Sequence, residues 1–415
     1  MSDTSAAPRS PEQRHALLDA LRGFALLGIL LMNIEFFSRP LQDFMSGMED
    51  ASGPAGVAAW AVYVFVQGKF WVLFALLFGM GFALLQTRLA GSDRPFTALY
   101  LRRTLALAVF GLLHIVLLWP GDILLAYAIT ALCLLPFAQV QGKALWISGV
   151  GLYLLVALSW VLMGWSMGYM PAEARVDVEA YMVEEAAKGI EAARIYATGS
   201  YLQISALRGQ DYFGYMFEQM LMFQVPMALG VFLLGGWLLR SGRITRAAEH
   251  RGFWVSLLLS GAAIGGVLAN ASLGIGSHFD PLTGFDRALL AAGVMALANL
   301  PLALAYLAAF VLLFNTRLGA RCLSLLAPAG RMALSNYLLQ SLLCGLLFYG
   351  YGLGWYGEVD RWQQVQIAFV IFATQLLLSP LWLRSFNYGP MEAVWRGLTY
   401  GRWPAMRRTR VLPPG

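Results

Sequence analysis

Apolar segments long enough to cross a membrane recur along the whole chain. A helix of about 20 apolar residues spans the hydrocarbon core of a bilayer. The pattern predicts ten such spans, which we place near residues 16–37, 68–88, 103–119, 123–138, 144–165, 213–239, 253–273, 288–314, 332–353 and 362–383. The sequence therefore predicts an all-α, polytopic membrane protein.

Polar stretches between the spans divide the chain into five predicted parts. These are a disordered cytoplasmic tail at 1–15, N-terminal membrane helices with the candidate site at 16–165, a helical insertion outside the bilayer at 166–211, C-terminal membrane helices at 212–384, and a basic tail at 385–415. The insertion is rich in Ala, Glu and Arg at helical spacing, which predicts two short helices there.

The loop charges predict how the chain is oriented. Arginines concentrate in the loops at 88–103, 240–251 and 317–331 and in the C-terminal tail. The alternate loops, at 38–56, 166–211, 274–287 and 354–361, are acidic or poor in Lys and Arg. Because positively charged loops stay in the cytoplasm, ten spans place both termini on the cytoplasmic side.

Composition supports the membrane assignment and excludes several classes of protein. Charged residues make up 13% of the chain, against about 25% in soluble domains, and the mean hydropathy is +0.63. A net charge of +6 would suggest nucleic acid as a partner of a soluble chain, but here the arginines lie in loops between spans. The chain has no Walker loop, HExxH or zinc spacing, which argues against an ATP-driven pump or a metallopeptidase. We therefore predict no metal and no permanently bound cofactor.

Polar residues in the first span lie along one face of the predicted helix. Asp19 and Arg22 are three residues apart, and Asn33 follows eleven residues later, which is three turns of helix. Gly23 and Gly28 would allow neighbouring helices to approach closely. Polar groups at membrane depth are costly unless they face protein or water, so we interpret this helix as one wall of a polar cavity. The alternative is that Asp19 and Arg22 form a pair at the lipid headgroups.

The third span repeats this arrangement and adds a candidate base. His114 lies eleven residues after Arg103, about 16 Å further along the same face. Asp122 follows a short Trp-Pro-Gly turn. A carboxylate beside a histidine fixes the tautomer and stabilises the imidazolium, as general base catalysis requires. The alternatives are that His114 only bonds a neighbour and that Asp122 caps the next helix.

Further polar residues are candidates for binding an anionic group. Lys69 lies near the outer end of the second span, where the alternative is that it extends to the headgroups. Arg102 adjoins Arg103, and Arg331 and Asn336 lie at the start of the ninth span, where polar side chains line a path or hold helices together. Glu35 points away from the Asn33 face by helical spacing, so we interpret it as a residue at the end of a loop.

Several segments together resemble the YeiB-like bacterial membrane proteins, which share a domain of unknown function (DUF418). They are RHALLDALRGFALLGILLMNI at 14–34, GKF at 68–70 with the following LFGMGFAL, LHIVLLWPGDILLAYA at 113–128, PAGRMALSNYLLQS at 328–341 and GPMEAVWRGLTY at 389–400. The resemblance covers nearly the whole chain. It implies a multi-pass protein of a bacterial cytoplasmic (inner) membrane and leaves the activity open.

The first span is also distantly similar to that of transmembrane acyltransferases, both the acyltransferase-3 type and the heparan-glucosaminide acetyltransferase type. Asp19, Arg22 and Asn33 match their Asp-x-x-Arg-Gly motif and the polar residue eleven positions after the arginine. The similarity implies transfer of an acyl group from cytoplasmic acyl-CoA, such as acetyl-CoA, to an acceptor on the far side. The acyltransferase-3 type has histidine where this chain has Asn33. The heparan-glucosaminide type has Asn there and a histidine in its first luminal loop, but the corresponding residues 38–56 of this chain contain no histidine. The base is therefore expected at His114.

The predicted function is acylation of an extracytoplasmic or lipid-linked acceptor, by O- or N-acyl transfer. His114 would deprotonate the acceptor, Asp122 would orient His114, and Asn33 would polarise the thioester carbonyl, while Arg22 and Arg103 receive the CoA phosphates. The predicted partners are the bilayer and a small-molecule, glycan or lipid acceptor, with monomer and homodimer both open. The alternatives are a transporter or exporter of a small amphipathic or anionic solute, and a non-catalytic lipid-binding or scaffold protein.

Overall fold

The computed structural model describes residues 11–40, 47–48, 51–90, 95–280 and 284–408 of the chain. Apart from two isolated bridges, Gly47 with His278 and Phe386 with Arg407, the regular structure of these residues is helical. This confirms the all-α prediction. The terminal tails at 1–10 and 409–415 lie outside the described residues.

The helices follow one another with short connections. Those before the insertion are α1 (Pro11–Asn33), which continues as a 3₁₀ turn (Ile34–Phe37), α2 (Gly53–Phe65), α3 (Lys69–Leu89), α4 (Phe96–Leu117), α5 (Leu124–Leu134) and α6 (Lys143–Met167). Those after it are α10 (Val225–Arg240), α11 (Arg251–Ile275), α12 (Phe285–Phe314), α13 (Arg317–Ser324), α14 (Ala327–Arg331), α15 (Ala333–Phe348), α16 (Arg361–Ser385) and α17 (Pro390–Tyr400).

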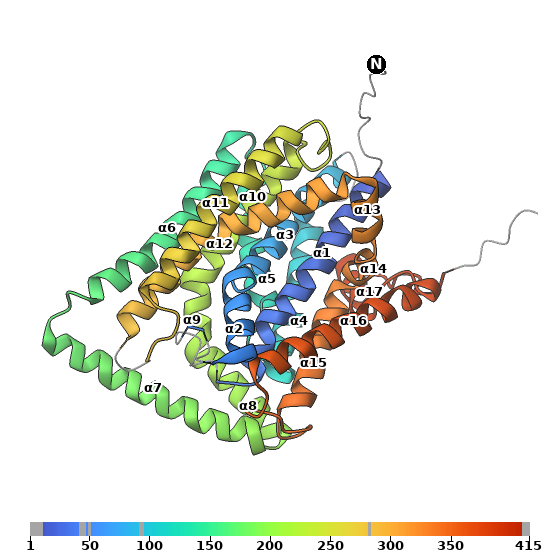
Figure 1. Ribbon diagram of the computed structural model, residues 1–415. Coiled ribbons are helices and arrows are strands. Elements are labelled where there is room, and N and C mark those ends of the chain that lie inside the picture. The colour runs from blue at the N-terminus through green and yellow to red at the C-terminus, as the bar shows by residue number, and fades with distance from the viewer. Residues whose placement is uncertain (1–10, 41–46, 49–50, 91–94, 281–283, 409–415) are drawn as a thin grey trace, which may run out of the picture.

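The insertion itself consists of a long helix and a shorter one. α7 (Ala172–Thr198) has 27 residues and α8 (Tyr201–Asp211) has 11, so the first is not the short helix that the sequence predicts. Two π-helical stretches and the three-residue α9 (Phe217–Gln219) connect α8 to α10. As Figure 1 shows, α7 runs across one end of the bundle, whereas α13 lies at the opposite end, beside the start of α1.

Eight stretches of the described residues are long and apolar enough to cross a membrane. They are Ala16–Phe37, Gly53–Leu89, Phe96–Leu117, Lys143–Met167, Tyr201–Arg240, Arg251–Ile275, Phe285–Phe314 and Arg361–Ser385. The other two predicted spans, at 123–138 and 332–353, form the shorter apolar helices Leu124–Phe137 and Ala333–Phe348. The chain is therefore a multi-pass membrane protein with eight candidate spans of full length.

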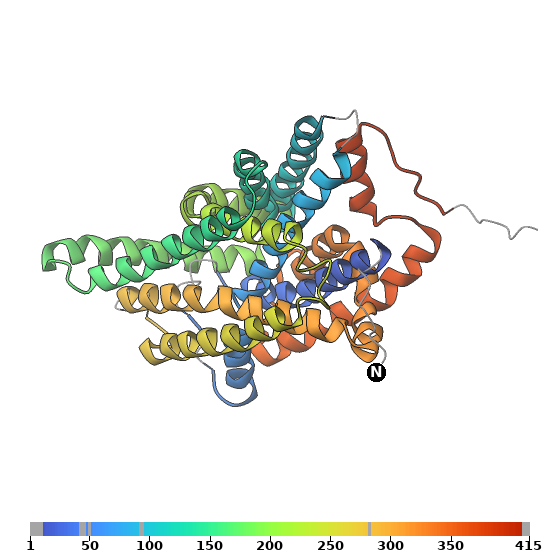
Figure 2. The ribbon, with the colours of Figure 1, turned by 90° about the horizontal axis from the view of Figure 1, so that it is seen from above.

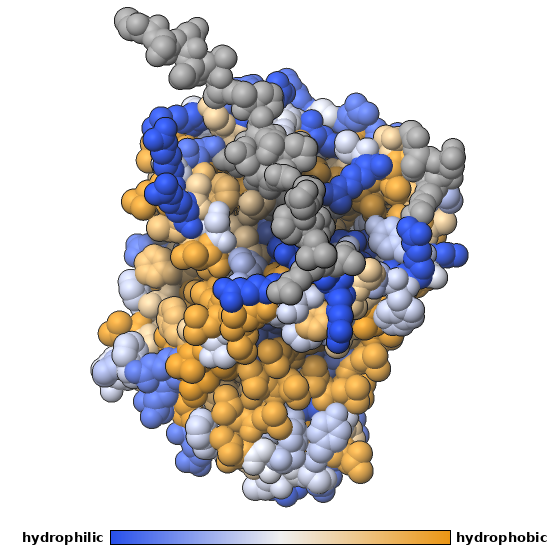
Figure 3. Space-filling model, turned by 90° about the vertical axis from the view of Figure 1, so that its right-hand side faces the viewer, coloured by the Kyte–Doolittle hydropathy of each residue, from blue (hydrophilic) through white to orange (hydrophobic). Residues whose placement is uncertain are grey.

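The helices form an outer array and an inner group. α11 packs along α12, and α12 and α10 both pack on α6 (Figures 1 and 2). α1 lies inside, against α3, α14 and α15. In Figure 3, hydrophilic side chains gather towards the α13 end of the visible face and apolar side chains cover much of the rest.

Glycine permits a close approach between α1 and α14. A Cβ atom on Gly330 of α14 would lie 1.8 Å from the Asp19 carbonyl oxygen, and one on Gly23 would lie 2.2 Å from the Leu326 carbonyl oxygen. The expectation that Gly23 admits a close neighbour is therefore confirmed. This contact fixes where the Asp19 and Arg22 side chains lie relative to α14.

Glu35 forms a buried ion pair, so its interpretation as a loop-end residue was wrong. Its carboxylate oxygen Oε2 lies 3.0 Å from Arg361 Nη2, and the other oxygen, Oε1, pairs with Arg39. The Glu35 and Arg361 side chains are 7% and 1% exposed. Arg361 donates further bonds to the Leu31 carbonyl and to Gln364. The 3₁₀ turn after α1 directs Glu35 towards α16, which helical spacing alone does not reveal.

We expect Arg361→Ala to destabilise the protein by about 1.5–3 kcal/mol, because the buried Glu35 carboxylate loses a charged hydrogen-bond partner and keeps its pair with Arg39. The measurement is the melting curve of the detergent-purified protein. Arg384→Ala, at an exposed position of the same helix, is the control and should leave the curve unchanged. Equal shifts for the two variants would contradict a stabilising role for the pair.

Candidate functional site

Three side chains from separate elements meet in a buried cluster. His114 lies in the last turn of α4, Asp122 in the turn before α5, and Ser341 in the middle of α15. His114 Nδ1 lies 2.8 Å from Asp122 Oδ2, and His114 Nε2 lies 2.8 Å from Ser341 Oγ. The His114 and Asp122 side chains have no solvent exposure. Both imidazole nitrogens are therefore engaged.

Asp122 has two roles, one for each carboxylate oxygen. Oδ2 faces His114, whereas Oδ1 accepts a 2.7 Å hydrogen bond from the Leu125 backbone N–H at the start of α5. From the sequence, Asp122 was either the partner of His114 or a helix cap. The side chain does both at once, with one oxygen for each role. The bond to Leu125 fixes the carboxylate rotamer, and with it the direction of the oxygen that faces His114.

Gly111 allows this turn to approach α4. A Cβ atom there would lie 2.5 Å from the Leu125 backbone nitrogen and 2.9 Å from Asp122 Oδ1. Real Cβ contacts are not this short, so only glycine lets Asp122 approach within bonding distance of His114, one turn further along α4.

We expect Gly111→Ala to push the turn at 121–125 away from α4 and to lengthen the contact between His114 and Asp122. The rate of any reaction that uses His114 as a base should fall at least tenfold, because a misplacement of a catalytic group by about 1 Å lowers the rate by that much or more. Gly151→Ala is a suitable control, since a Cβ atom there meets no other atom within 4 Å. A Gly111→Ala protein as active as the Gly151→Ala protein would contradict this role.

A small cavity lies beside the cluster. Its lining residues come from α1, the following turn and α15: Leu30, Asn33, Phe37, Tyr337, Gln340 and Ser341. The volume is about 10 Å³, which is room for about one water molecule. Asn33 is thus placed next to Ser341, near the base that the sequence predicts.

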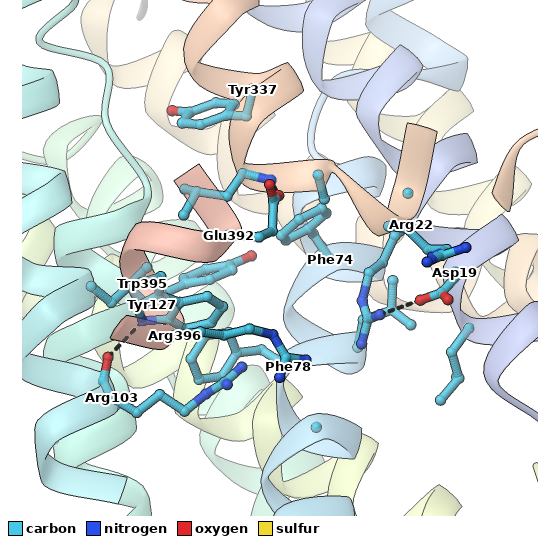
Figure 4. Close-up of a pocket in the computed structure, with 18 of the residues that line it drawn as sticks. Asp19, Arg22, Phe74, Phe78, Arg103, Tyr127, Tyr337, Glu392, Trp395 and Arg396 are labelled. Carbon is cyan, nitrogen blue, oxygen red and sulfur yellow. Dashed lines mark hydrogen bonds and ion pairs between the residues drawn. The ribbon is translucent and has the colours of Figure 1, made fainter. Parts of the chain in front are cut away.

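A second, much larger pocket of about 450 Å³ lies on the other side of Tyr337. Five arginines and two carboxylates line it, so its walls carry net positive charge: Arg22, Arg88, Arg103, Arg331, Arg396, Asp19 and Glu392. Figure 4 shows the guanidinium groups of Arg22, Arg103 and Arg396 directed into the same region, with Tyr337 at the far side. The remaining wall is mainly apolar and aromatic, including Phe74, Phe78 and Tyr127.

Several contacts hold the charged walls in place. Arg22 bonds Asp19 at 2.6 Å. The Arg103 guanidinium lies 3.8 Å from the centre of the Trp395 ring, and Trp395 donates a hydrogen bond to the Arg103 carbonyl. α17 therefore forms part of the pocket, a role that the sequence does not indicate.

Glu392 fastens α17 to the start of α15. Its carboxylate accepts hydrogen bonds from the Leu334 and Ser335 N–H groups and from the Ser335 hydroxyl. Burial raises the pKa of the Glu392 carboxyl, and the bonds from Ser335 oppose that rise. The side chain thus caps the start of α15 and holds α17 against it.

Tyr337 separates the two cavities. It lines both of them, and its ring centre lies 5.0 Å from that of His114. One face of α1 also follows both, with Asp19 and Arg22 in the large pocket and Asn33 in the small cavity. The polar face predicted for the first span thus runs from the arginines to the buried cluster.

Three predicted binding residues lie elsewhere. Lys69 is fully buried, donates to the Tyr63 carbonyl at 3.1 Å and contacts Met295 Sδ. Arg102 is exposed and is not part of the pocket wall. Asn336 donates to the Ala329 carbonyl and to Ser379 Oγ, and accepts from Gln375 through its own carbonyl. Asn336 therefore connects α15 to α14 and α16. Of the two roles considered from the sequence, it holds helices together and does not line the pocket.

Ser341 is not among the site residues that the sequence predicts. A serine in an apolar helix is ordinary, and its partner His114 lies 227 positions away. A signal was available only in the spacing of α15, since Tyr337 and Ser341 are four residues apart and share a face.

Comparison with known proteins gives the family. The family model "Protein of unknown function (DUF418)" matches residues 238–402. The chain is 33% identical to "Uncharacterized protein YxaH" of Bacillus subtilis (strain 168) over 424 aligned positions, covering 98% of this chain and all of that protein. It is 31% identical to "Uncharacterized protein YeiB" of Escherichia coli (strain K12), covering 96% and 99%. The chain belongs to the DUF418 family. No solved structure matches it.

The DUF418 match covers only part of the candidate site. It includes Ser341, Arg331 and the pocket residues of α17, whereas His114 and Asp122 precede it. The similarity to the YxaH and YeiB proteins extends over both parts. The cluster therefore joins the DUF418 segment to the helices before it.

Proposed function

We propose that this DUF418 protein is a membrane-embedded acyltransferase, which moves an acyl group from acyl-CoA to an extracytoplasmic or lipid-linked acceptor. The observation that carries the proposal is a buried carboxylate–histidine–serine cluster one side chain away from a large pocket walled by arginines. Such a cluster suits acyl transfer, and arginines suit a phosphorylated donor.

The large pocket would hold the donor. Arginine forms strong, directional hydrogen bonds with phosphate oxygens, and Arg22, Arg103 and Arg396 are directed into one region of the pocket (Figure 4). The apolar and aromatic wall that continues to Tyr337 suits the less polar arm and acyl chain. By the charge of the neighbouring loops, this end would face the cytoplasm, where acyl-CoA is made.

The positions along α4 set the distance that the donor must cover. Arg103 and His114 are eleven residues apart on one helix, about 16 Å along its axis. A donor with its phosphates at Arg103 must therefore extend three turns to bring its thioester to His114. The small cavity holds only about one water molecule, so Tyr337 has to move before the thioester arrives.

The buried cluster would supply the chemistry. His114 Nε2 takes the proton of the attacking group, Asp122 holds the imidazole and stabilises its charged form, and Asn33 stabilises the thioester oxygen as it becomes negative. Since the cluster is screened from water, these electrostatic effects are stronger than they would be at a surface.

The test is ligand-induced stabilisation of the detergent-purified protein by acetyl-CoA, with free CoA and ATP as controls. A ligand at one hundred times its dissociation constant adds about 2.7 kcal/mol to the stability of the folded state. Stabilisation by acetyl-CoA beyond that by ATP supports the proposal. No stabilisation by acetyl-, butyryl- or palmitoyl-CoA would contradict it and favour the alternative of a transporter, with His114 as a proton relay.

A further inference from the structure

Ser341 is the hydrogen-bond partner of His114 Nε2. Its Oγ lies 2.8 Å from His114 Nε2 and 3.4 Å from the Tyr337 carbonyl oxygen, and the side chain also lines the small cavity. The hydroxyl therefore lies between His114 Nε2 and the small cavity, on the side from which a thioester carbonyl would approach once Tyr337 has moved.

The bond to Asp122 decides which nitrogen can accept a proton. An ionised carboxylate only accepts hydrogen bonds, so His114 Nδ1 carries the proton that faces Asp122. Nε2 is then the basic nitrogen, and the Ser341 hydroxyl donates to it. This order of carboxylate, imidazole and hydroxyl activates a serine as a nucleophile.

We infer that Ser341 carries the acyl group covalently between donor and acceptor. This inference rests on the proposed acyltransferase function and specifies its course. Both imidazole nitrogens are occupied, so an acceptor cannot give its proton to His114 unless the Ser341 hydroxyl leaves Nε2. Ser341 is consequently the group that loses its proton first.

The first half of the reaction forms the acyl-enzyme. Ser341 Oγ attacks the thioester carbonyl carbon while its proton passes to His114 Nε2. The carbon–sulfur bond then breaks, and the departing sulfur takes the proton from Nε2. The products are an ester on Ser341 and free CoA, and no oxidant or further reactant is needed.

The second half returns the enzyme to its starting state. An acceptor hydroxyl or amine gives its proton to Nε2 and attacks the ester carbonyl, and Ser341 Oγ leaves and recovers that proton. In both halves Asn33, which lines the same small cavity as Ser341, lies where it can donate to the negatively charged carbonyl oxygen. A covalent carrier also means that donor and acceptor need not occupy the site together.

The experiment uses the full-length protein in detergent with ¹³C-acetyl-CoA and no acceptor, followed by acid quenching and mass spectrometry. We expect a burst of about one CoA per protein and one labelled acetyl group on the peptide that contains Ser341. Ser341→Ala should lose the label and at least a hundredfold in the burst rate. Ser272→Ala is the matched control, because Ser272 is an equally buried serine that bonds a carbonyl in another helix, and it should keep both.

Hydroxylamine as a surrogate acceptor separates the two ways to fail. If wild type and Ser341→Ala both convert acetyl-CoA to acetohydroxamate well above the protein-free rate and within threefold of each other, and no label appears, the covalent carrier is wrong and the acyltransferase stands. If acetyl-CoA neither stabilises the protein nor releases CoA, the acyltransferase is wrong and the carrier is excluded with it. A Ser341→Cys protein that forms a hydroxylamine-sensitive thioester would confirm the position of the nucleophile.

Discussion

His114→Ala and Asp122→Asn are each expected to lower acyl transfer from acetyl-CoA to hydroxylamine by about 10³–10⁴-fold. General base catalysis contributes about 10²–10⁴, and loss of the orienting carboxylate in such a cluster leaves the wrong tautomer, with a loss of the same order. In Asp122→Asn, the remaining side-chain oxygen can still accept from the Leu125 N–H, so the start of α5 keeps its cap. The loss should therefore appear in the rate and not in the melting curve.

A histidine outside the cluster provides the control. His278 is exposed and contacts the Met48 carbonyl, so His278→Ala should retain full activity. If His114→Ala and Asp122→Asn stay within threefold of wild type, the buried cluster is not the site of chemistry.

The second large effect is expected at Arg103, and its neighbour Arg102 is the matched control. Arg103 lines the pocket and lies over Trp395, whereas its neighbour Arg102 is exposed and absent from the wall. A hydrogen bond to a charged group is worth about 1.5–3 kcal/mol, so Arg103→Ala should weaken acetyl-CoA binding about 10–100-fold. Arg102→Ala should change it less than twofold.

The measurement is the dissociation constant from the ligand-induced shift in melting temperature. The shift is compared within each variant, because Arg103→Ala also removes the contact with Trp395 and lowers the starting stability. Arg396→Ala should weaken binding in the same way, since Arg396 is directed into the same region (Figure 4). Equal losses in Arg102→Ala and Arg103→Ala would indicate a general effect of charge and not a built phosphate site.

The sequence by itself determined the helical membrane class and the content of individual faces. An apolar segment of span length forms a helix in a bilayer, because a helix pairs its own backbone groups and an unpaired backbone group is too costly there. The helical period likewise places Arg103 and His114 on one face of α4, and Asp19, Arg22 and Asn33 on one face of α1, since the spacing within a helix is fixed by its geometry. Asp122 was predictable beside His114 because a short turn joins them.

Only the tertiary structure decided which helix faces meet. Ser341 reaches His114 from 227 positions away, Glu35 pairs with Arg361 of α16, and α17 completes the pocket through Trp395 and Arg396. These partners depend on close approaches such as that of Gly330 to α1, which no periodicity within one helix encodes. The same packing places Lys69 and Asn336 away from the pocket, because residues on different helices share a site only when their faces pack against each other.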